Sequence, residues 1–319
     1  MRYERAFALC IAFMAACGTP PAPPDTAAAP RAAPSHDEPA LTQVTEGRAG
    51  EDQDPEVSPD GTRLFFASTA FGPDSDLFVK TIGSNTSTRL TRLPGDERFP
   101  KVNPADSNLV AFSTNTRGSW EVAILNLSGD LERLEYVSET GADSLHPSWS
   151  PDGRKLVYCA ADPVSRGEWI LKVRDMASGK TQVLEGIDGL LPEWSPVDNR
   201  IVFQRMKHRD GWLGSVWTVE LESGVAKDLT ALFAEDDAAA INPAWSPDGR
   251  HVIFARLAAG GPASGDDLWV VGVDGSRPTR LTSSPAADGM PAWGRDGLIY
   301  FVSNRRGTSR IWSLRPALP

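Results

Sequence analysis

The stretch Pro147-Ser-Trp-Ser-Pro-Asp-Gly153 recurs along this chain of 319 residues. Two further full copies and three partial ones are present, starting at Pro55, Pro243, Pro100, Pro192 and Pro291. The six leading prolines follow one another at steps of 45 to 51 residues. A near-constant period in this range indicates a repeat architecture, so we expect six structural units of one kind.

Each copy contains a tight turn that leads into a strand. In Ser58-Pro-Asp-Gly61 the Pro pre-sets φ, the Asp suits the third turn position, and the Gly can take the positive φ of a type I turn with a bulge. The fourth copy has one extra residue, and we expect Asn199 to take the left-handed conformation there. A short apolar run follows every turn, which is typical of a buried strand. The runs are 64–67, 109–112, 156–159, 201–203, 252–255 and 298–301.

A third and a fourth strand complete the repeated unit. The third carries an aromatic residue, as in Leu268-Trp-Val-Val271, and the fourth follows a polar turn, as in Thr279-Arg-Leu-Thr282. Six such units without helical stretches predict an all-β fold, a six-bladed β-propeller with four antiparallel strands per blade. Nine of the ten tryptophans fall at two positions of the repeat, where we expect them to pack one blade against the next.

The sixth unit ends after its third strand, close to Pro319. A segment near the other end, Pro39-Ala-Leu-Thr-Gln-Val-Thr45, resembles the fourth strands and directly precedes the first unit. We expect this N-terminal strand, about 39–45, to pair with the last blade. Such pairing closes the ring and removes an open sheet edge.

The full pattern resembles the WD40-like repeat of the TolB-type propeller family. The resemblance rests on Pro-x-Trp-Ser-Pro-Asp-Gly, a Leu-Trp-Val type strand and an Arg-Leu-Thr strand, and it covers 39–319. It implies an envelope protein whose propeller binds a peptidoglycan-associated lipoprotein at its channel mouth. TolB itself has an α/β domain before the propeller. Only a short tail precedes the first unit here, so we expect that domain to be missing.

The N-terminus has the features of a secretion signal. Met1-Arg-Tyr-Glu-Arg5 is a basic start, and 6–16 is an apolar run too short to span a bilayer. Met14-Ala-Ala-Cys17 resembles a bacterial lipobox, which implies cleavage after residue 16 and lipidation of Cys17. Ordinary cleavage with an incidental cysteine is the alternative. Gly18 after the cysteine implies the outer membrane rather than the inner membrane.

Residues 17–38 are rich in Pro and Ala and are expected to form a lipid-anchored tether to the propeller at 39–319. Besides Cys17 and Cys10 in the signal, the chain has Cys159 on an apolar run, where a buried, inert thiol is expected. The net charge of −10 gives no basic field for phosphates, so nucleic acid is disfavoured as a partner. We expect a monomer that meets the membrane only through its lipid anchor.

An acidic residue precedes the leading proline in every unit, on the ring face that also carries the loops between second and third strands. One interpretation is that these carboxylates cap turns. The other is a ring of acids at the channel mouth that holds Ca²⁺ or a basic segment of a partner. The candidates are Asp54, Asp96, Asp143, Asp188, Asp237 and Asp288.

The same face carries two segments that read as irregular loops, 205–214 and 256–267. Irregular loops on a rigid scaffold are common binding sites, and exposed Arg and Trp are common hot spots. A solvated variable loop is the alternative. The candidate partner-binding residues are Arg98, His146, Arg205, His208, Arg209, Trp212 and Arg305.

The sequence shows no Gly-x-Ser-x-Gly elbow, no Cys/His cluster and no phosphate loop. We therefore expect a non-enzymatic protein-binding scaffold of the cell envelope, with no catalytic residue and no cofactor other than a conceivable Ca²⁺. The rival hypothesis is an enzyme or a carbohydrate or metal binder that uses the central channel. It predicts a deep pocket where His146 and acids such as Asp188 converge.

Overall fold

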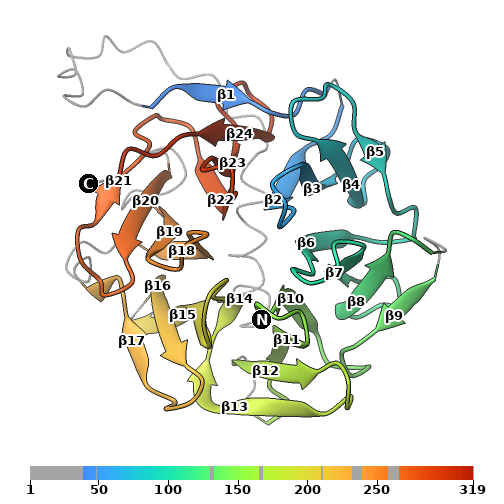
Figure 1. The fold of residues 1–319 in the computed structure, drawn as a ribbon, viewed down its shortest axis with the longest axis vertical. Helices are drawn as coiled ribbons and strands as arrows, with labels where there is room; N and C mark the ends of the chain where they lie inside the picture. Colours follow the sequence, from blue (N-terminus) through green and yellow to red (C-terminus); the bar gives the residue numbers. More distant parts are fainter. Residues whose placement is uncertain are drawn as a thin grey trace.

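The computed structural model describes residues 39–47, 49–129, 133–164, 168–209, 211–231, 239–257 and 266–318, with the backbone alone for 206–209 and 211–213. Its strands form six separate sheets of four antiparallel strands each, arranged as a ring (Figure 1). The predicted six-bladed β-propeller is therefore confirmed. No helix in the described part of the chain has the length and apolar character needed to cross a membrane.

Each blade runs from the centre of the ring outward. The innermost strands are β2 (Asp52–Val57), β6 (Glu97–Val102), β10 (Ser144–Trp149), β14 (Leu190–Trp194), β18 (Ala240–Trp245) and β22 (Asp288–Trp293). The second strands are β3 (Arg63–Ser68), β7 (Leu109–Thr114), β11 (Lys155–Ala161), β15 (Arg200–Arg209), β19 (His251–Arg256) and β23 (Ile299–Ser303). Blades one to six follow this chain order, and every innermost strand contains the leading proline of its unit.

The third strands are β4 (Asp76–Thr81), β8 (Glu121–Asn126), β12 (Trp169–Asp175), β16 (Gly211–Glu220), β20 (Asp267–Gly272) and β24 (Arg310–Leu314). The outermost strands are β5 (Thr88–Arg89), β9 (Leu134–Tyr136), β13 (Thr181–Asp188), β17 (Ala226–Asp228), β21 (Thr279–Arg280) and, in blade six, β1 (Leu41–Gln43). β1 pairs antiparallel with β24, with Leu41 opposite Leu314 and Gln43 opposite Trp312. The predicted closure of the ring is confirmed.

The Ser-Pro-Asp-Gly turn forms as its composition predicts. In blade one the Gly61 N–H donates to the Ser58 carbonyl at 2.8 Å, the Ser58 hydroxyl donates to Asp60 Oδ1 at 2.6 Å, and Gly61 has φ of 72°. Blades three and five repeat the serine–aspartate contact. The expectation for Asn199 was wrong, because its φ is not positive; Asp198 Oδ1 instead accepts from the Arg200 N–H at 3.2 Å.

The core lies between neighbouring blades. One buried cluster joins Val122 and Ile124 of blade two to Trp149, Leu156 and Tyr158 of blade three, and five similar clusters are present in the described ring. The repeat tryptophans also make polar contacts across blades, since Trp149 Nε1 donates to the Lys101 carbonyl and Trp245 Nε1 to the Glu193 carbonyl, both at 3.0 Å. A tryptophan thus buries roughly 150–250 Å² and fixes the spacing of two blades.

Candidate binding site in the central channel

The residue before each leading proline has a left-handed backbone in all six blades. The φ values lie between 49° and 55° for Asp54, Phe99, His146, Leu191, Asn242 and Met290. The ladder to the second strand shifts register at the same place in every blade. A bulge of this kind re-aims a side chain. Non-glycine residues at positive φ are uncommon, and they cluster at binding sites.

These six residues and their prolines line one cavity of about 70 Å³ in the channel. The lining alternates around the ring. Blades one, three and five contribute polar side chains, from Asp54, His146 and Asn242. Blades two, four and six contribute apolar ones, from Phe99, Leu191 and Met290. Three polar residues therefore line one cavity, with an apolar residue between each two.

Asp54 is held by a buried ion pair. Arg98 Nε donates to Asp54 Oδ2 at 2.5 Å, Arg98 Nη2 donates to Gln53 Oε1 at 2.5 Å, and the Phe99 N–H reaches the same Asp54 oxygen at 3.2 Å. Both charged side chains are less than a tenth exposed. Both contacts to Asp54 use Oδ2, and within the described residues the buried Oδ1 has no hydrogen-bond partner.

The imidazole ring of His146 contacts the side chain of a buried cysteine. Cys159 Sγ donates to the Leu145 carbonyl at 3.3 Å and lies 3.2 Å from His146 Nδ1. The thiol has one hydrogen, and with that hydrogen on the Leu145 carbonyl, Nδ1 is the donor to Sγ and Nε2 is left as an acceptor. No described group bonds Nε2. Burial, helped by the charge of Arg98, lowers the pKa of His146 to about 3, so the ring is neutral. Cys159 is fully buried, as expected from its apolar run.

A charged bridge crosses the channel below this cavity. Lys101 Nζ of blade two lies 3.0 Å from Glu56 Oε2 of blade one and 3.5 Å from Glu193 Oε2 of blade four. Lys101 and Glu193 line both the 70 Å³ cavity and a second cavity of about 150 Å³ toward the Ser-Pro-Asp-Gly turns. Burial raises the pKa of Glu56, while Glu193 and Glu56 raise the pKa of Lys101 against the opposing effect of burial. The bridge separates two chambers.

The acids predicted at the rim meet two kinds of partner. Asp96 Oδ1 accepts from the Ser75 N–H at 2.9 Å, and Asp143 Oδ1 accepts from the Trp120 N–H at 3.0 Å, so both stabilise loops. Asp54, Asp188 and Asp288 each pair with an arginine from the candidate set. The partners are Arg98, Arg205 at 2.5 Å and Arg305 at 2.8 Å. Asp237 lies outside the described residues, as do Cys17 and the side chains of His208, Arg209 and Trp212.

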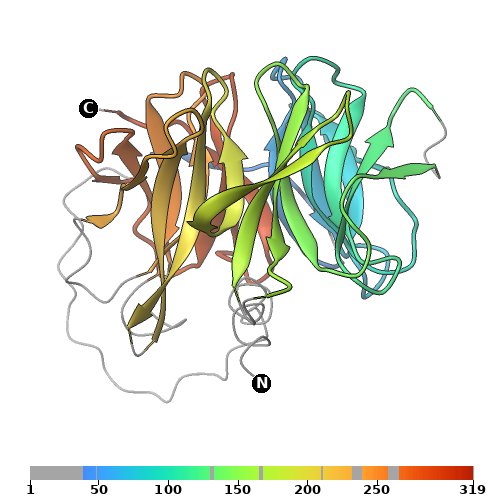
Figure 2. The same cartoon turned by 90° about the horizontal axis from the view of Figure 1, so that it is seen from below.

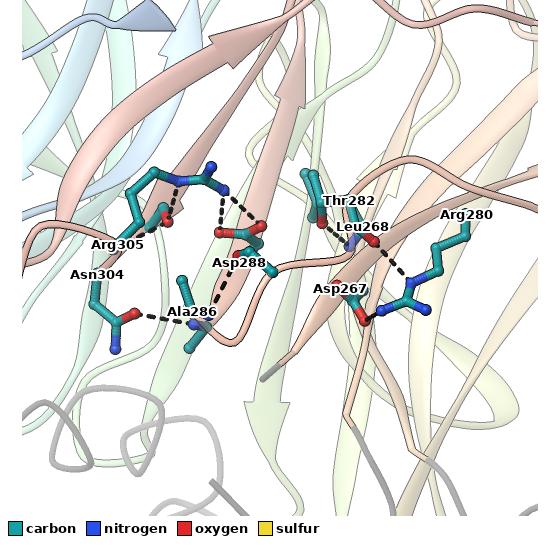
Figure 3. Close-up of polar contacts among 11 residues, drawn as sticks. Asp267, Leu268, Arg280, Thr282, Ala286, Asp288, Asn304 and Arg305 are labelled. Carbon is teal, nitrogen blue, oxygen red and sulfur yellow. Dashed lines mark hydrogen bonds and ion pairs between the residues drawn. The ribbon is translucent and has the colours of Figure 1, made fainter. Parts of the chain in front are cut away.

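Figure 3 shows two acid–arginine pairs of blades five and six, Arg305 with Asp288 and Arg280 with Asp267 at 2.6 Å. Burial raises the pKa of Asp267 to about 6, and Asp288 adds to the effect against the opposing charge of Arg280. In the described part of the chain, no three His, Cys, Asp or Glu side chains come together in a way that could hold a metal ion.

The segment expected as an irregular loop, 205–214, is instead a β-ribbon. β15 and β16 each have ten residues and stay in register as far as Arg209 opposite Gly211. Second strands elsewhere have five to seven residues. The ribbon therefore extends past the rim (Figure 2), on the face where the pre-proline residues enter the channel. The turn residues that would mark a hairpin, Asp210-Gly211, were a signal the sequence offered.

These features define a class of protein, a closed six-bladed propeller with a partitioned channel and one elaborated face. The family model for the TolB beta propeller domain matches residues 40–232 and 189–316. The chain belongs to this family.

Individual relatives agree with the family. The Tol-Pal system protein TolB of Anaeromyxobacter dehalogenans is 32% identical over 130 residues, which is 40% of this chain and 27% of that protein. The chain thus spans about a quarter of the TolB proteins it matches. An Agrobacterium tumefaciens protein assigned as a TolB has a TM-score of 0.64 at 17% identity, covering 89% of this chain and all of the other. An oligogalacturonate lyase of Vibrio parahaemolyticus has a TM-score of 0.57 at 13% identity, covering 86% and 93%, and shows the fold alone.

Proposed function

We propose that this chain is a non-enzymatic protein-binding scaffold of the bacterial cell envelope. In this proposal Cys17 carries the lipid anchor, and the propeller faces the periplasm, held at the outer membrane. The names of the relatives support an envelope role, since they belong to the Tol-Pal system. A peptidoglycan-associated lipoprotein is the kind of partner that the family implies.

The observation that carries the proposal is the ribbon of β15 and β16. β14 pairs with β15 only as far as Gln204, and β17 pairs with β16 only from Trp217 onward. From Arg205 to Arg209 on β15 and from Gly211 to Ser215 on β16, no described strand pairs with the outer edges of the ribbon. An unpaired edge offers alternating N–H and C=O groups to an extended segment of another chain. The ribbon extends from the face on which the pre-proline residues enter the channel, so one partner could contact the ribbon and that face together.

The charge of this face supports the choice of residues. Arg205 is about a third exposed, stacks 5.0 Å from the centre of the Trp217 ring and pairs with Asp188. Arg205 begins the free part of β15, and the sequence continues with Lys207, His208 and Arg209, then Trp212 after the turn. We propose these residues as the partner contacts. Arg305 and Arg98 are each paired with an aspartate, so their charges are already balanced within the propeller.

The rival hypothesis, an enzyme or a carbohydrate binder, depends on His146 and Asp188 sharing a pocket. His146 lines the channel cavity, but Asp188 is not among its lining residues and pairs with Arg205 at the rim. The likeness to a lyase, at 13% identity, shows the fold alone. The hypothesis of an enzyme or a carbohydrate binder is therefore kept only as the alternative to the scaffold in the experiment below.

A crosslinked envelope pulldown tests the proposal. Deleting 206–208 together with 212–214 removes three register pairs and keeps the turn at 209–211. We expect the intact chain to capture an envelope lipoprotein, and both this deletion and the pair Arg209→Glu with Trp212→Ala to lose it. A matched control carries Arg154→Glu and Val197→Ala on exposed residues of the opposite face. Identical partners from all variants would exclude the ribbon as the site.

A further inference from the structure

We infer that the channel cavity is a binding site for a primary ammonium group. The inference concerns Asp54, His146 and Asn242 and is independent of the ribbon. Each of these side chains presents a buried polar atom that has no hydrogen-bond partner among the described residues: Asp54 Oδ1, His146 Nε2 and Asn242 Oδ1. All three residues line the same 70 Å³ cavity.

All three orphaned atoms are acceptors. The carboxylate oxygen and the amide oxygen carry no hydrogen, and with the Cys159 thiol hydrogen on the Leu145 carbonyl the imidazole proton lies on Nδ1. Leaving a buried acceptor unpaired costs about 1–3 kcal/mol. A ligand that completes this site must therefore bring several donors, and acceptors on the ligand would find no counterpart on these groups.

The positions of these three residues around the ring favour one kind of hydrogen-bond donor group over others. Asp54, His146 and Asn242 come from blades one, three and five of a six-bladed ring, so they alternate with a threefold pattern. A primary ammonium has three N–H donors in threefold array and no acceptor. A guanidinium is planar and has five donors, which this pattern does not match. A water has two donors and leaves its own lone pairs facing the same acceptors.

Charge and size agree with a small singly charged group. Asp54 supplies one negative charge, and Arg98 balances it through Oδ2 from outside the cavity lining. The other two charged residues of the lining, Lys101 and Glu193, pair with each other. That nearby guanidinium disfavours a divalent cation more strongly than a monovalent one. The cavity of about 70 Å³ has room for about two water molecules at roughly 30 Å³ each. Phe99, Leu191 and Met290 lie between the acceptors and can contact the methylene groups next to the nitrogen.

Two sources could supply this chemistry, a free alkylamine or a protein amine such as a lysine side chain or a chain N-terminus. Calorimetric titration of the full mature chain with three probes distinguishes them: ethylammonium, Nα-acetyl-lysine methylamide and glycylglycine amide. Tetramethylammonium, which has no N–H, is the matched control at equal ionic strength. We expect saturable binding of at least one primary amine and none of tetramethylammonium, with the preferred probe identifying the source.

The ring itself supplies conservative variants. Asn242→Leu installs the residue that blade four carries at Leu191, and His146→Phe installs the residue that blade two carries at Phe99, both at the same φ. We expect each to weaken the preferred amine about tenfold or more, because a hydrogen bond to a charged group is lost. Leu191→Met, which installs the residue that blade six carries at Met290, should leave affinity within twofold.

Three results would overturn the inference. The first is an absence of saturable binding for all three amines to a chain whose melting curve is intact. The second is binding that Asn242→Leu and His146→Phe both leave unchanged. The third is tight binding of Mn²⁺ or Zn²⁺ that both variants abolish while the amines fail to bind. The pulldown from the ribbon is unaffected by any of these results, so the two proposals fail separately.

Discussion

The hydroxyl oxygen of Thr45 accepts a hydrogen bond at 3.0 Å from the backbone N–H of Ile311, 266 residues later in the chain. The same contact joins the fourth and third strands within other blades, as in Thr91 with Leu77 and Thr282 with Leu268. The segment before blade one is thus bonded to blade six as a native fourth strand would be, which is how the ring closes.

Thr45→Val should destabilise the propeller, because it leaves the buried Ile311 N–H without a partner while preserving side-chain shape. We expect a loss of about 1–3 kcal/mol in the free energy of unfolding, measured by urea denaturation. Thr42→Val, on the exposed side of β1, is the control and should stay within about 0.5 kcal/mol. Equal midpoints for the two variants would show that closure does not depend on this contact.

Lys101→Met should destabilise the channel by leaving Glu56 and Glu193 as an unpaired pair of acids. Removing one partner of a buried ion pair costs about 3–5 kcal/mol when burial is complete, and the partial exposure of these side chains makes about 2 kcal/mol more reasonable. The loss should shrink as pH falls toward 4, because Glu56, whose pKa is raised by burial, takes up a proton. Unfolding curves at pH 7 and pH 4 measure this difference, and an equal loss at both would argue against the bridge.

Because of the buried carboxyl group of Glu97, the free energy of unfolding should fall as pH rises. Burial raises its pKa from 4.5 to about 7, against bonds from Thr91 and Thr114 that lower it. Between pH 4.5 and about pH 7 the native state therefore holds a proton that the unfolded state has lost. The resulting stabilisation disappears as pH passes 7. Asp267, with a pKa near 6, acts in the same direction. The Glu97 contribution is at most about 3 kcal/mol.

Glu97→Gln should flatten this dependence, since glutamine keeps the acceptor oxygen and cannot ionise. Melting temperatures from pH 5 to pH 8 measure the slope. Glu135→Gln, at an exposed position of β9, is the control and should leave the slope unchanged. If Glu97→Gln and the parent protein lose stability in parallel, the slope has another source.

His146 should stay neutral throughout the accessible pH range, with its proton on Nδ1. The ¹⁵N chemical shifts of the imidazole report both properties directly. We expect no titration between pH 5 and pH 8, because the pKa is lowered to about 3. Cys159→Ala should release the Nδ1 proton from its partner and mix the two tautomers. A titration near pH 6.5 in the parent protein would contradict the account of this pair.

The tight turns and the closing strand of the fold could be predicted from the sequence. Ser58-Pro-Asp-Gly61 predicts its own turn because the chemistry of four adjacent residues determines it. Gln43-Val-Thr45 could be recognised as a displaced strand for a similar reason. Gln43 Nε2 donates to the Thr45 carbonyl at 2.8 Å, as Arg280 Nε donates to the Thr282 carbonyl within blade five.

The channel cavity, the Lys101 bridge and the ribbon could not be predicted from the sequence in the same way. Residues before proline favour extended backbone, so nothing local predicts the left-handed φ of Asp54 or His146. The contact of His146 with Cys159 depends on the register of two strands, and the Lys101 bridge reaches Glu193 of blade four, which is not a neighbour of blade two. The ribbon was missed because 205–214 lacks alternating apolar residues, although its Asp210-Gly211 turn was present.

The central claim is that the elaborated face of the ring binds a protein of the envelope. The most direct measurement is the affinity of a purified peptidoglycan-associated lipoprotein from the same cell for three forms of the chain. These forms are the parent, the ribbon deletion and the opposite-face control. The account predicts saturable binding to the parent and the control, and a loss of at least tenfold for the deletion. Equal affinity for all three forms, or no binding to a correctly folded parent, would contradict it.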